Sequence, residues 1–105
     1  MLKGKRQGRD IYVWDNGDTY DGNYENDKMN GIGKLISYSL IFTYEGHFAN
    51  GVFDGQGTYQ NENGGWKYEG LFKNGKQEGE GRIYFGKGKS QKGIWENGVL
   101  ITKTN

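Results

Sequence analysis

The side chains that most often carry chemistry are few in this chain and lie apart from one another. His47 is the one histidine and there is no cysteine. A metal site would therefore have no second imidazole and no thiolate as ligands, and the chain has no thiol nucleophile. Gly88, Lys89 and Ser90 match the last three residues of a phosphate-binding loop, but Ile83 stands where that motif requires a glycine. We therefore expect no catalytic site, no metal and no other cofactor.

The carboxylates and glycines that recur favour a structural role over a reactive one. Asp21, Glu45 and Glu69 each precede a glycine, at intervals of 24 residues, but a calcium site would need more acidic ligands in each unit. We interpret this row as solvated outward positions. The sequences GIG, GQG and GEG each lack the third glycine of a dinucleotide-binding fingerprint. These glycines therefore need an explanation from the elements around them.

Internal repeats supply that explanation. YDGNYEND begins at Tyr20, YEGHFANG at Tyr44 and YEGLFKNG at Tyr68, with 24 residues between successive starts, and QKGIWENG follows from Gln91 after 23. GIG, GQG and GEG complete the first three copies. We divide the single domain 1–105 into a half unit, three full units and a terminal half unit, with boundaries at 3–19, 20–43, 44–67, 68–90 and 91–105.

Each full unit has the pattern of a β-hairpin. Large or glycine residues alternate with others at Tyr44, Gly46 and Phe48, which is the period of a strand, and an asparagine-glycine pair marks the turn. A single hairpin is marginal in water, so the hairpins should stack. Eight strands at ~4.8 Å spacing would give an antiparallel sheet of roughly 35–40 Å.

Glycines inside these strands have no side chain, so we expect aromatic rings from neighbouring strands to pack directly on their backbone. We call a glycine in this role a floor. The predicted floors are Gly22, Gly33, Gly46, Gly57, Gly70, Gly81 and Gly93. The rings that should cover them, and line an aromatic groove, are Tyr20, Tyr24, Tyr44, Phe48, Tyr68, Phe72 and Trp95.

The pattern YxGxFxNGxxxGxG, as in YEGHFANGVFDGQG and YEGLFKNGKQEGEG, resembles the MORN repeat (membrane occupation and recognition nexus). The resemblance covers nearly the whole chain and implies an all-β, elongated, single-layer sheet of stacked hairpins. Members of that family are mostly intracellular scaffolds, and enzymes that carry the repeats have a separate catalytic domain. The resemblance thus implies a non-catalytic module that binds protein partners in a cytoskeletal, ciliary or membrane-apposed assembly. A phospholipid- or small-ligand-binding module is the alternative.

The middle of the chain departs from the pattern and is the predicted partner contact. Leu40, Ile41 and Phe42 are apolar where other links use asparagine and glycine, and Val52 and Phe53 make the following turn apolar as well. These side chains could form a small local core, or they could contact a partner or a second copy. For a contact, serine at Phe42 and Phe53 should weaken association and leave the fold intact.

Charge is unevenly distributed although the net charge is only +1. Residues 1–9 carry +4, residues 10–66 carry −7 and residues 67–105 carry +4. In a linear array this predicts basic ends and an acidic middle. The charges could form a solvated face, or ends of one sign could meet middles of the other in a partner or along a polymer, through contacts that weaken with salt. The acidic middle opposes nucleic-acid binding. Anionic lipid, which is not favoured because glutamates are interspersed, would contact Lys73, Lys76, Arg82, Lys87 and Lys89.

Composition also bears on location. No apolar run approaches the ~20 residues that span a bilayer, and the N-terminus MLKGKRQGRD has no apolar stretch after its positive charges. With 15% aromatic residues and low net charge, disorder is not expected. We expect an intracellular protein, and the resemblance implies that it is cytoplasmic or associated with the cytoskeleton or a cilium.

Overall fold

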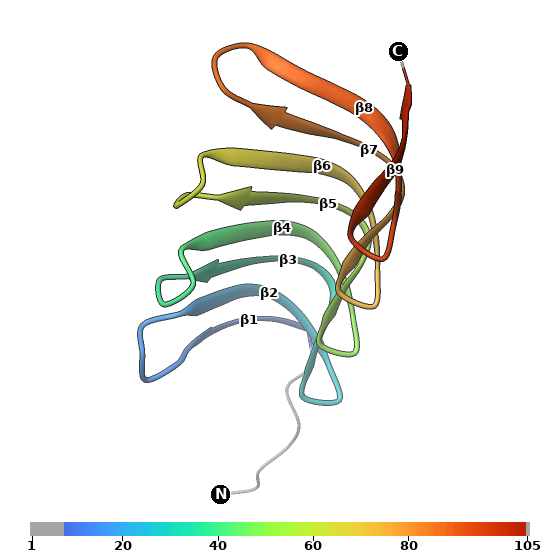
Figure 1. The fold of residues 1–105 in the computed structure, drawn as a ribbon. Coiled ribbons are helices and arrows are strands. Elements are labelled where there is room, and N and C mark those ends of the chain that lie inside the picture. The colour runs from blue at the N-terminus through green and yellow to red at the C-terminus, as the bar shows by residue number, and fades with distance from the viewer. Residues whose placement is uncertain (1–7, 105) are drawn as a thin grey trace, which may run out of the picture.

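The computed structural model describes residues 8–104, which form one open antiparallel sheet of nine strands (Figure 1). Each strand pairs only with its neighbours in sequence, so the order in the sheet is β1 to β9. The strands are β1 (Gly8–Val13), β2 (Thr19–Glu25), β3 (Lys28–Ser37), β4 (Phe42–Ala49), β5 (Val52–Asn61), β6 (Trp66–Lys73), β7 (Lys76–Phe85), β8 (Lys89–Glu96) and β9 (Val99–Thr104). The protein extends 55 × 24 × 18 Å. This elongated shape agrees with a single-layer array of hairpins, although the longest dimension exceeds the length expected from eight strands.

The described residues contain one strand more than the eight that the repeats predict. The extra strand is β9, which follows a turn at Asn97 and Gly98 with φ angles of 51° and 83°. Because this turn reverses the chain, the terminal segment pairs back on β8 through residues 99–104 and completes a fourth hairpin.

The four hairpin turns share one backbone conformation, with positive φ at both central residues. Type I′ turns require this, and asparagine and glycine tolerate it at low cost. Asn50–Gly51 and Asn74–Gly75 follow the predicted pattern, while the first turn uses Asn26 and Asp27. The predicted turn chemistry is confirmed.

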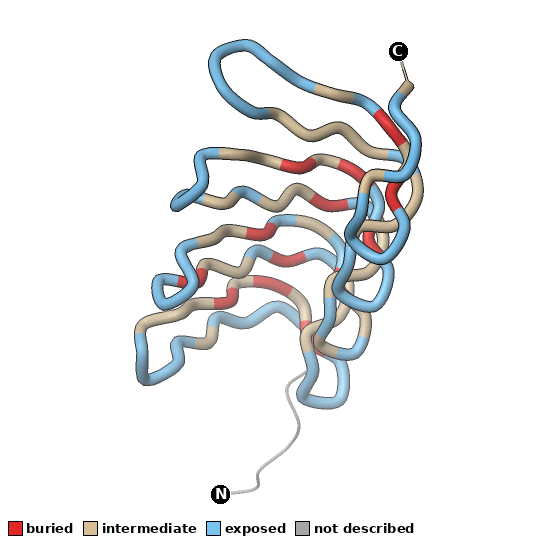
Figure 2. Tube along the Cα trace, in the orientation of Figure 1, coloured by how far each residue is buried: buried red, intermediate tan, exposed pale blue. Residues whose placement is uncertain are grey.

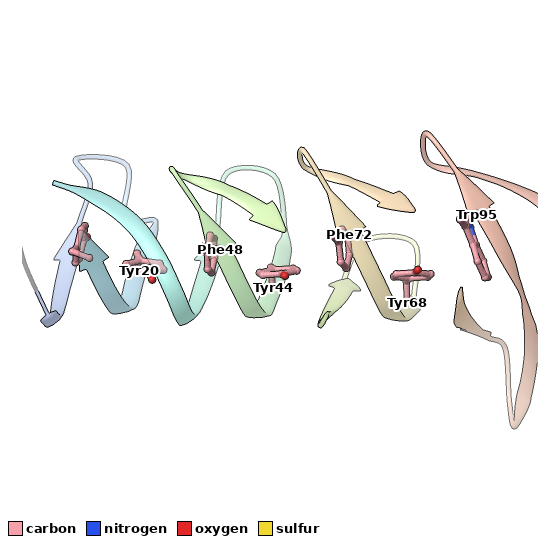
Figure 3. Packing of buried hydrophobic residues seen from close by; sticks show 7 residues of the cluster. Tyr20, Tyr44, Phe48, Tyr68, Phe72 and Trp95 are labelled. Atoms are coloured by element: carbon pink, nitrogen blue, oxygen red, sulfur yellow. The ribbon is translucent and has the colours of Figure 1, made fainter. Parts of the chain in front are cut away.

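The core is a single row of rings along the inner face of the curved sheet, where buried positions recur (Figure 2). Neighbouring rings meet edge to face, for example Tyr20 with Phe48 at 5.1 Å and Tyr44 with Phe72 at 5.1 Å between centroids (Figure 3). Such contacts join each hairpin to the next. A thin layer can therefore be stable without a second sheet.

Of the seven rings predicted to cover glycine floors, Tyr20, Tyr44 and Tyr68 do so. None of the atoms nearest to the predicted floors belongs to the other four, Tyr24, Phe48, Phe72 and Trp95. A Cβ built on Gly33, Gly57 or Gly81 would lie 2.2–2.3 Å from the hydroxyl oxygen of the tyrosine that covers it. The last floor differs, because a Cβ on Gly93 would meet Leu100 and the Thr102 carbonyl rather than an aromatic ring.

A bulge bends each of the first three hairpins next to its floor. In the β4–β5 hairpin, pairing shifts between Gly46 and Phe48, so His47 faces three residues of β5. Gly55 lies among those three with φ +106°, a conformation that glycine adopts without strain. The bend brings rings from the two ends of the hairpin together. Along a straight strand, Phe42 and Phe48 would stand about 20 Å apart. Phe53 is paired with Phe48, yet its ring centroid is 6.3 Å from that of Phe42.

Candidate functional site

The seven rings that were predicted to line a groove are all buried. Their exposed fractions are 8% or less, so a partner would not reach them, and they hold the hairpins together. The buried hydroxyls are satisfied, since Tyr20, Tyr44 and Tyr68 donate hydrogen bonds of 2.8–3.0 Å to the carbonyl three residues on. Burial raises the pKa of Tyr20 and Tyr68 to about 12.

Three half-buried rings beside this core form what we call the aromatic platform: Phe42 on β4, Tyr59 on β5 and Trp66 on β6. Tyr59 stacks on Phe42 with centroids 4.8 Å apart and on Trp66 with centroids 5.6 Å apart. A hollow of about 250 Å³ opens beside Tyr59 and Trp66, with Phe72 and Lys76 also in its wall. The platform therefore offers flat aromatic surface at the rim of the core.

Tyr59 and Trp66 were not among the predicted site residues. Trp66 stands two positions before Tyr68, so strand periodicity alone places it on the same face as the core. Its cross-strand partner Asn61 ends β5, whereas Tyr68 pairs with Tyr59. Position at the end of a strand explains why Trp66 stays half-buried while Tyr68 is fully covered.

The structure divides the predicted partner contact. Phe53 stacks on the core residue Tyr44, with centroids 3.8 Å apart and planes at 11°, and Phe42 belongs to the platform. Both rings support the fold, so serine at these positions should destabilise it, contrary to the expectation from sequence. The bend in β4 and β5 causes this difference, because it folds both ends of the hairpin onto the same row of rings.

The remaining three residues of that contact are exposed but do not share a surface. Leu40 is 71% exposed and Ile41 is 44% exposed, and both lie in the link between β3 and β4. Val52, which is 40% exposed, begins β5 next to the hairpin turn at the other end of β4. Leu40 and Ile41 therefore form one candidate contact, and Val52 stands apart from it.

The residues proposed for anionic lipid are not brought together either. Lys73 and Lys76 pair beside the β6–β7 turn, whereas Lys87 and Lys89 lie at the other end of β7. Arg82 lies between them and donates a hydrogen bond of 2.9 Å to Ser90. Of the basic N-terminal segment, residues 1–7 lie outside the described residues.

The recurring carboxylates Asp21, Glu45 and Glu69 lie on the outer face, opposite the rings, and Asp21 and Glu69 engage other side chains there. Arg9 lies 3.3 Å from Asp21, and Lys67 lies 3.5 Å from Glu69, which also accepts a hydrogen bond from Tyr84 at 3.0 Å. His47 is exposed on this face. Among residues 8–104, no three or more His, Asp or Glu side chains are grouped as a metal site would require.

Asp18 fixes the link between β3 and β4. Its carboxylate accepts hydrogen bonds from the Tyr38 and Ser39 amides at 2.8 and 3.3 Å, and from the Ser37 hydroxyl at 3.1 Å. Desolvation alone would raise the pKa of Asp18, but these hydrogen bonds together lower it. The link between β3 and β4 is thereby tied to the link between β1 and β2, 20 residues away in sequence.

A family model described as MORN repeat matches residues 2–19, 20–39, 44–66 and 68–90. The chain belongs to the MORN-repeat family. The four matches leave out residues 40–43, where the β3–β4 link departs from the repeat pattern, and the last match ends at residue 90, near the start of β8. MORN repeats are generally non-catalytic modules. No curated protein matches the chain.

Within the described part of this MORN-repeat protein, no helix has the length and apolar character needed to cross a membrane.

Proposed function

We propose that this chain is a non-catalytic scaffold that binds protein partners through its aromatic platform, in an intracellular assembly of the cytoskeletal, ciliary or membrane-apposed kind. The observation that carries the proposal is the stack of Phe42, Tyr59 and Trp66 beside an open hollow. Stacked rings with one free side are the anchors that protein interfaces favour, because they bury much apolar area with little loss of side-chain freedom.

A repeat array suits this role because its platform is held by contacts on both sides. Phe42 pairs with Asn61 on β5, and Trp66 pairs with Phe85 on β7, so the rings rest on the four strands of two hairpins. Little ordering would be needed when a partner binds, which favours affinity.

The test is affinity purification of the tagged chain from its source cells at low and high salt, followed by binding measurements with each purified partner. Trp66→Ala should weaken that binding by at least about tenfold, as expected for a central aromatic anchor. Trp66→Phe, which keeps a ring, should restore most of it. Trp14→Ala is the matched control, because Trp14 lies in the link between β1 and β2, away from the platform.

Circular dichroism should show that each variant keeps the strand content of the unmodified protein. Binding that is equal for Trp66→Ala and Trp14→Ala would contradict the proposal. Recovery of membranes alone, without a protein partner, would instead favour the phospholipid-binding alternative.

A further inference from the structure

Four links join successive strands at one end of the strands, and the hairpin turns lie at the opposite end (Figure 1). We call the side of the sheet that carries the links the link edge. The links are residues 14–18, 38–41, 62–65 and 86–88. The second and third have the same length and register, since Ser37 pairs with Phe42 as Asn61 pairs with Trp66. The backbone of these two links can thus be compared residue by residue.

Ile41 occupies a backbone position that the third link gives to glycine. Its φ is +57°, and the equivalent Gly65 has φ +71°. A β-branched residue is strained in this left-handed conformation. Every other non-glycine residue with positive φ in residues 8–104 is an asparagine or aspartate of a hairpin turn. Isoleucine at this position therefore works against the stability of the link.

Burial does not explain the isoleucine. Tyr38, Leu40 and Ile41 are 63%, 71% and 44% exposed, and we call these three residues the link patch. Backbone strain at an exposed apolar residue points to a contact that the isolated fold does not contain. Beside the patch is a hollow of about 360 Å³, whose wall includes Ile36, Ile41 and Glu62.

The backbone of the link patch is held in place before any partner arrives. Asp18 accepts hydrogen bonds from the amides of Tyr38 and Ser39, and the Leu40 amide donates to the Ser37 hydroxyl at 3.1 Å. The Glu62 amide donates to the Ile41 carbonyl at 3.1 Å, which ties the second link to the third. A preorganised loop loses little entropy on binding.

Charge along the link edge changes sign. The first three links contain no lysine or arginine, and exposed Asp15 and Glu62 flank the patch on either side. The fourth link carries Lys87, with Lys89 next to it and Phe85, which is 43% exposed, on its other side. This basic segment around an exposed ring is complementary to an apolar patch with acidic flanks.

We propose that the link patch binds the fourth link of a second copy of this chain. If two copies align antiparallel along their link edges, the second link of each meets the fourth link of the other, and the third links face each other across the two-fold axis. The contact is then isologous and closes as a dimer. The glycines at 64 and 65 let the third links approach closely. Phe42 of the aromatic platform also lines the hollow beside the link patch, so the two proposed surfaces are neighbours. The charge variants below leave all three rings of the platform unchanged, so they test the dimer separately from the proposed function.

Charge reversal gives the sharpest test, read by sedimentation velocity of the whole chain over a concentration series. Asp15→Lys with Glu62→Lys should abolish the dimer, and so should Lys87→Glu with Lys89→Glu, because each pair places like charges in both contacts. An equimolar mixture of the two double variants should dimerise again, since both contacts then join opposite charges. A wild-type chain that remains monomeric at every concentration would overturn the proposal, as would a mixture that fails to associate.

Ile41→Gly separates the cost of the strain from the benefit of the contact. This variant should raise the midpoint of thermal unfolding and weaken dimerisation by about tenfold or more. Ile32→Ser is the control, because Ile32 is 51% exposed on the outer face of β3, and this variant should leave the dimer unchanged. Loss of thermal stability in Ile41→Gly, or equal weakening by Ile32→Ser, would contradict the assignment of Ile41 to the contact.

Discussion

The outgoing strands of the β4–β5 and β8–β9 hairpins carry the same pattern, with a glycine at Gly46 or Gly93 and a large ring two residues later at Phe48 or Trp95. Their returning strands differ. In the middle hairpin Gly57 faces Gly46, whereas in the last hairpin Lys103 faces Gly93.

The residue that covers the floor differs together with the returning strand. Tyr44 covers the two glycines of the middle hairpin, but Gln91 takes the equivalent position in the last one, and the Leu100 side chain fills the space over Gly93. The tyrosine and the second glycine thus depend on each other, because the ring fits only over a backbone without a Cβ. Where one is replaced, so is the other. Lys103 also places a charge on an edge strand, which disfavours further strand pairing.

The buried tyrosines, which the last hairpin lacks, should have their largest effect on unfolding at alkaline pH. Burial raises the pKa of Tyr20 and Tyr68 to about 12, and raises that of Tyr44 as well, while unfolded tyrosines ionise near pH 10. The folded state therefore binds more protons above pH 10, and its stability should be full below that pH and lost as the pH rises towards 12. Circular dichroism and tyrosinate absorbance, followed together, should show unfolding coincident with ionisation of the buried tyrosines. Ionisation of all eight tyrosines near pH 10 without unfolding would contradict this account.

Gly57→Ala should have the next largest effect, because its Cβ would lie 2.2 Å from the Tyr44 hydroxyl oxygen. We expect a loss of about 3 kcal/mol or more in the free energy of unfolding, measured with urea. Gly51→Ala is the matched control: no atom lies within 4 Å of its Cβ, and only its φ of +87° opposes alanine, at a cost of about 1 kcal/mol. Equal losses of stability in the two variants would show that the close approach of the Tyr44 ring to Gly57 does not determine the cost.

Tyr44→Phe should have the smallest effect of the three. The ring and its packing remain, but the hydroxyl that donates to the His47 carbonyl at 2.8 Å is lost. We expect a loss of about 1–2 kcal/mol in the free energy of unfolding. Tyr38→Phe, at a side chain that is 63% exposed, should change it by less than about 0.5 kcal/mol. If both variants behave alike, the tyrosine in the repeat is conserved between units for its ring and not for its hydroxyl.

Much of the fold followed from the repeats. All seven predicted rings are buried, because each stands at one of two places that recur in every hairpin and therefore meets similar neighbours. The turn residues were equally predictable, since positive φ leaves few residue types to choose from. The candidate sites were less so, as Tyr59 and Trp66 occupy strand positions whose exposure depends on where the strands end.

The sequence by itself determined the repeat unit, the inner face and the turns, because these depend on spacing along one hairpin. Tertiary structure alone decided which apolar residues of the middle unit are available. Phe42 and Phe53 became part of the packing because bulges bend the hairpin and bring its two ends together. Ile41 was left exposed at a strained φ because Asp18, from the link between β1 and β2, fixes the link around it. Both outcomes depend on contacts between residues distant in sequence, which the repeat pattern does not contain.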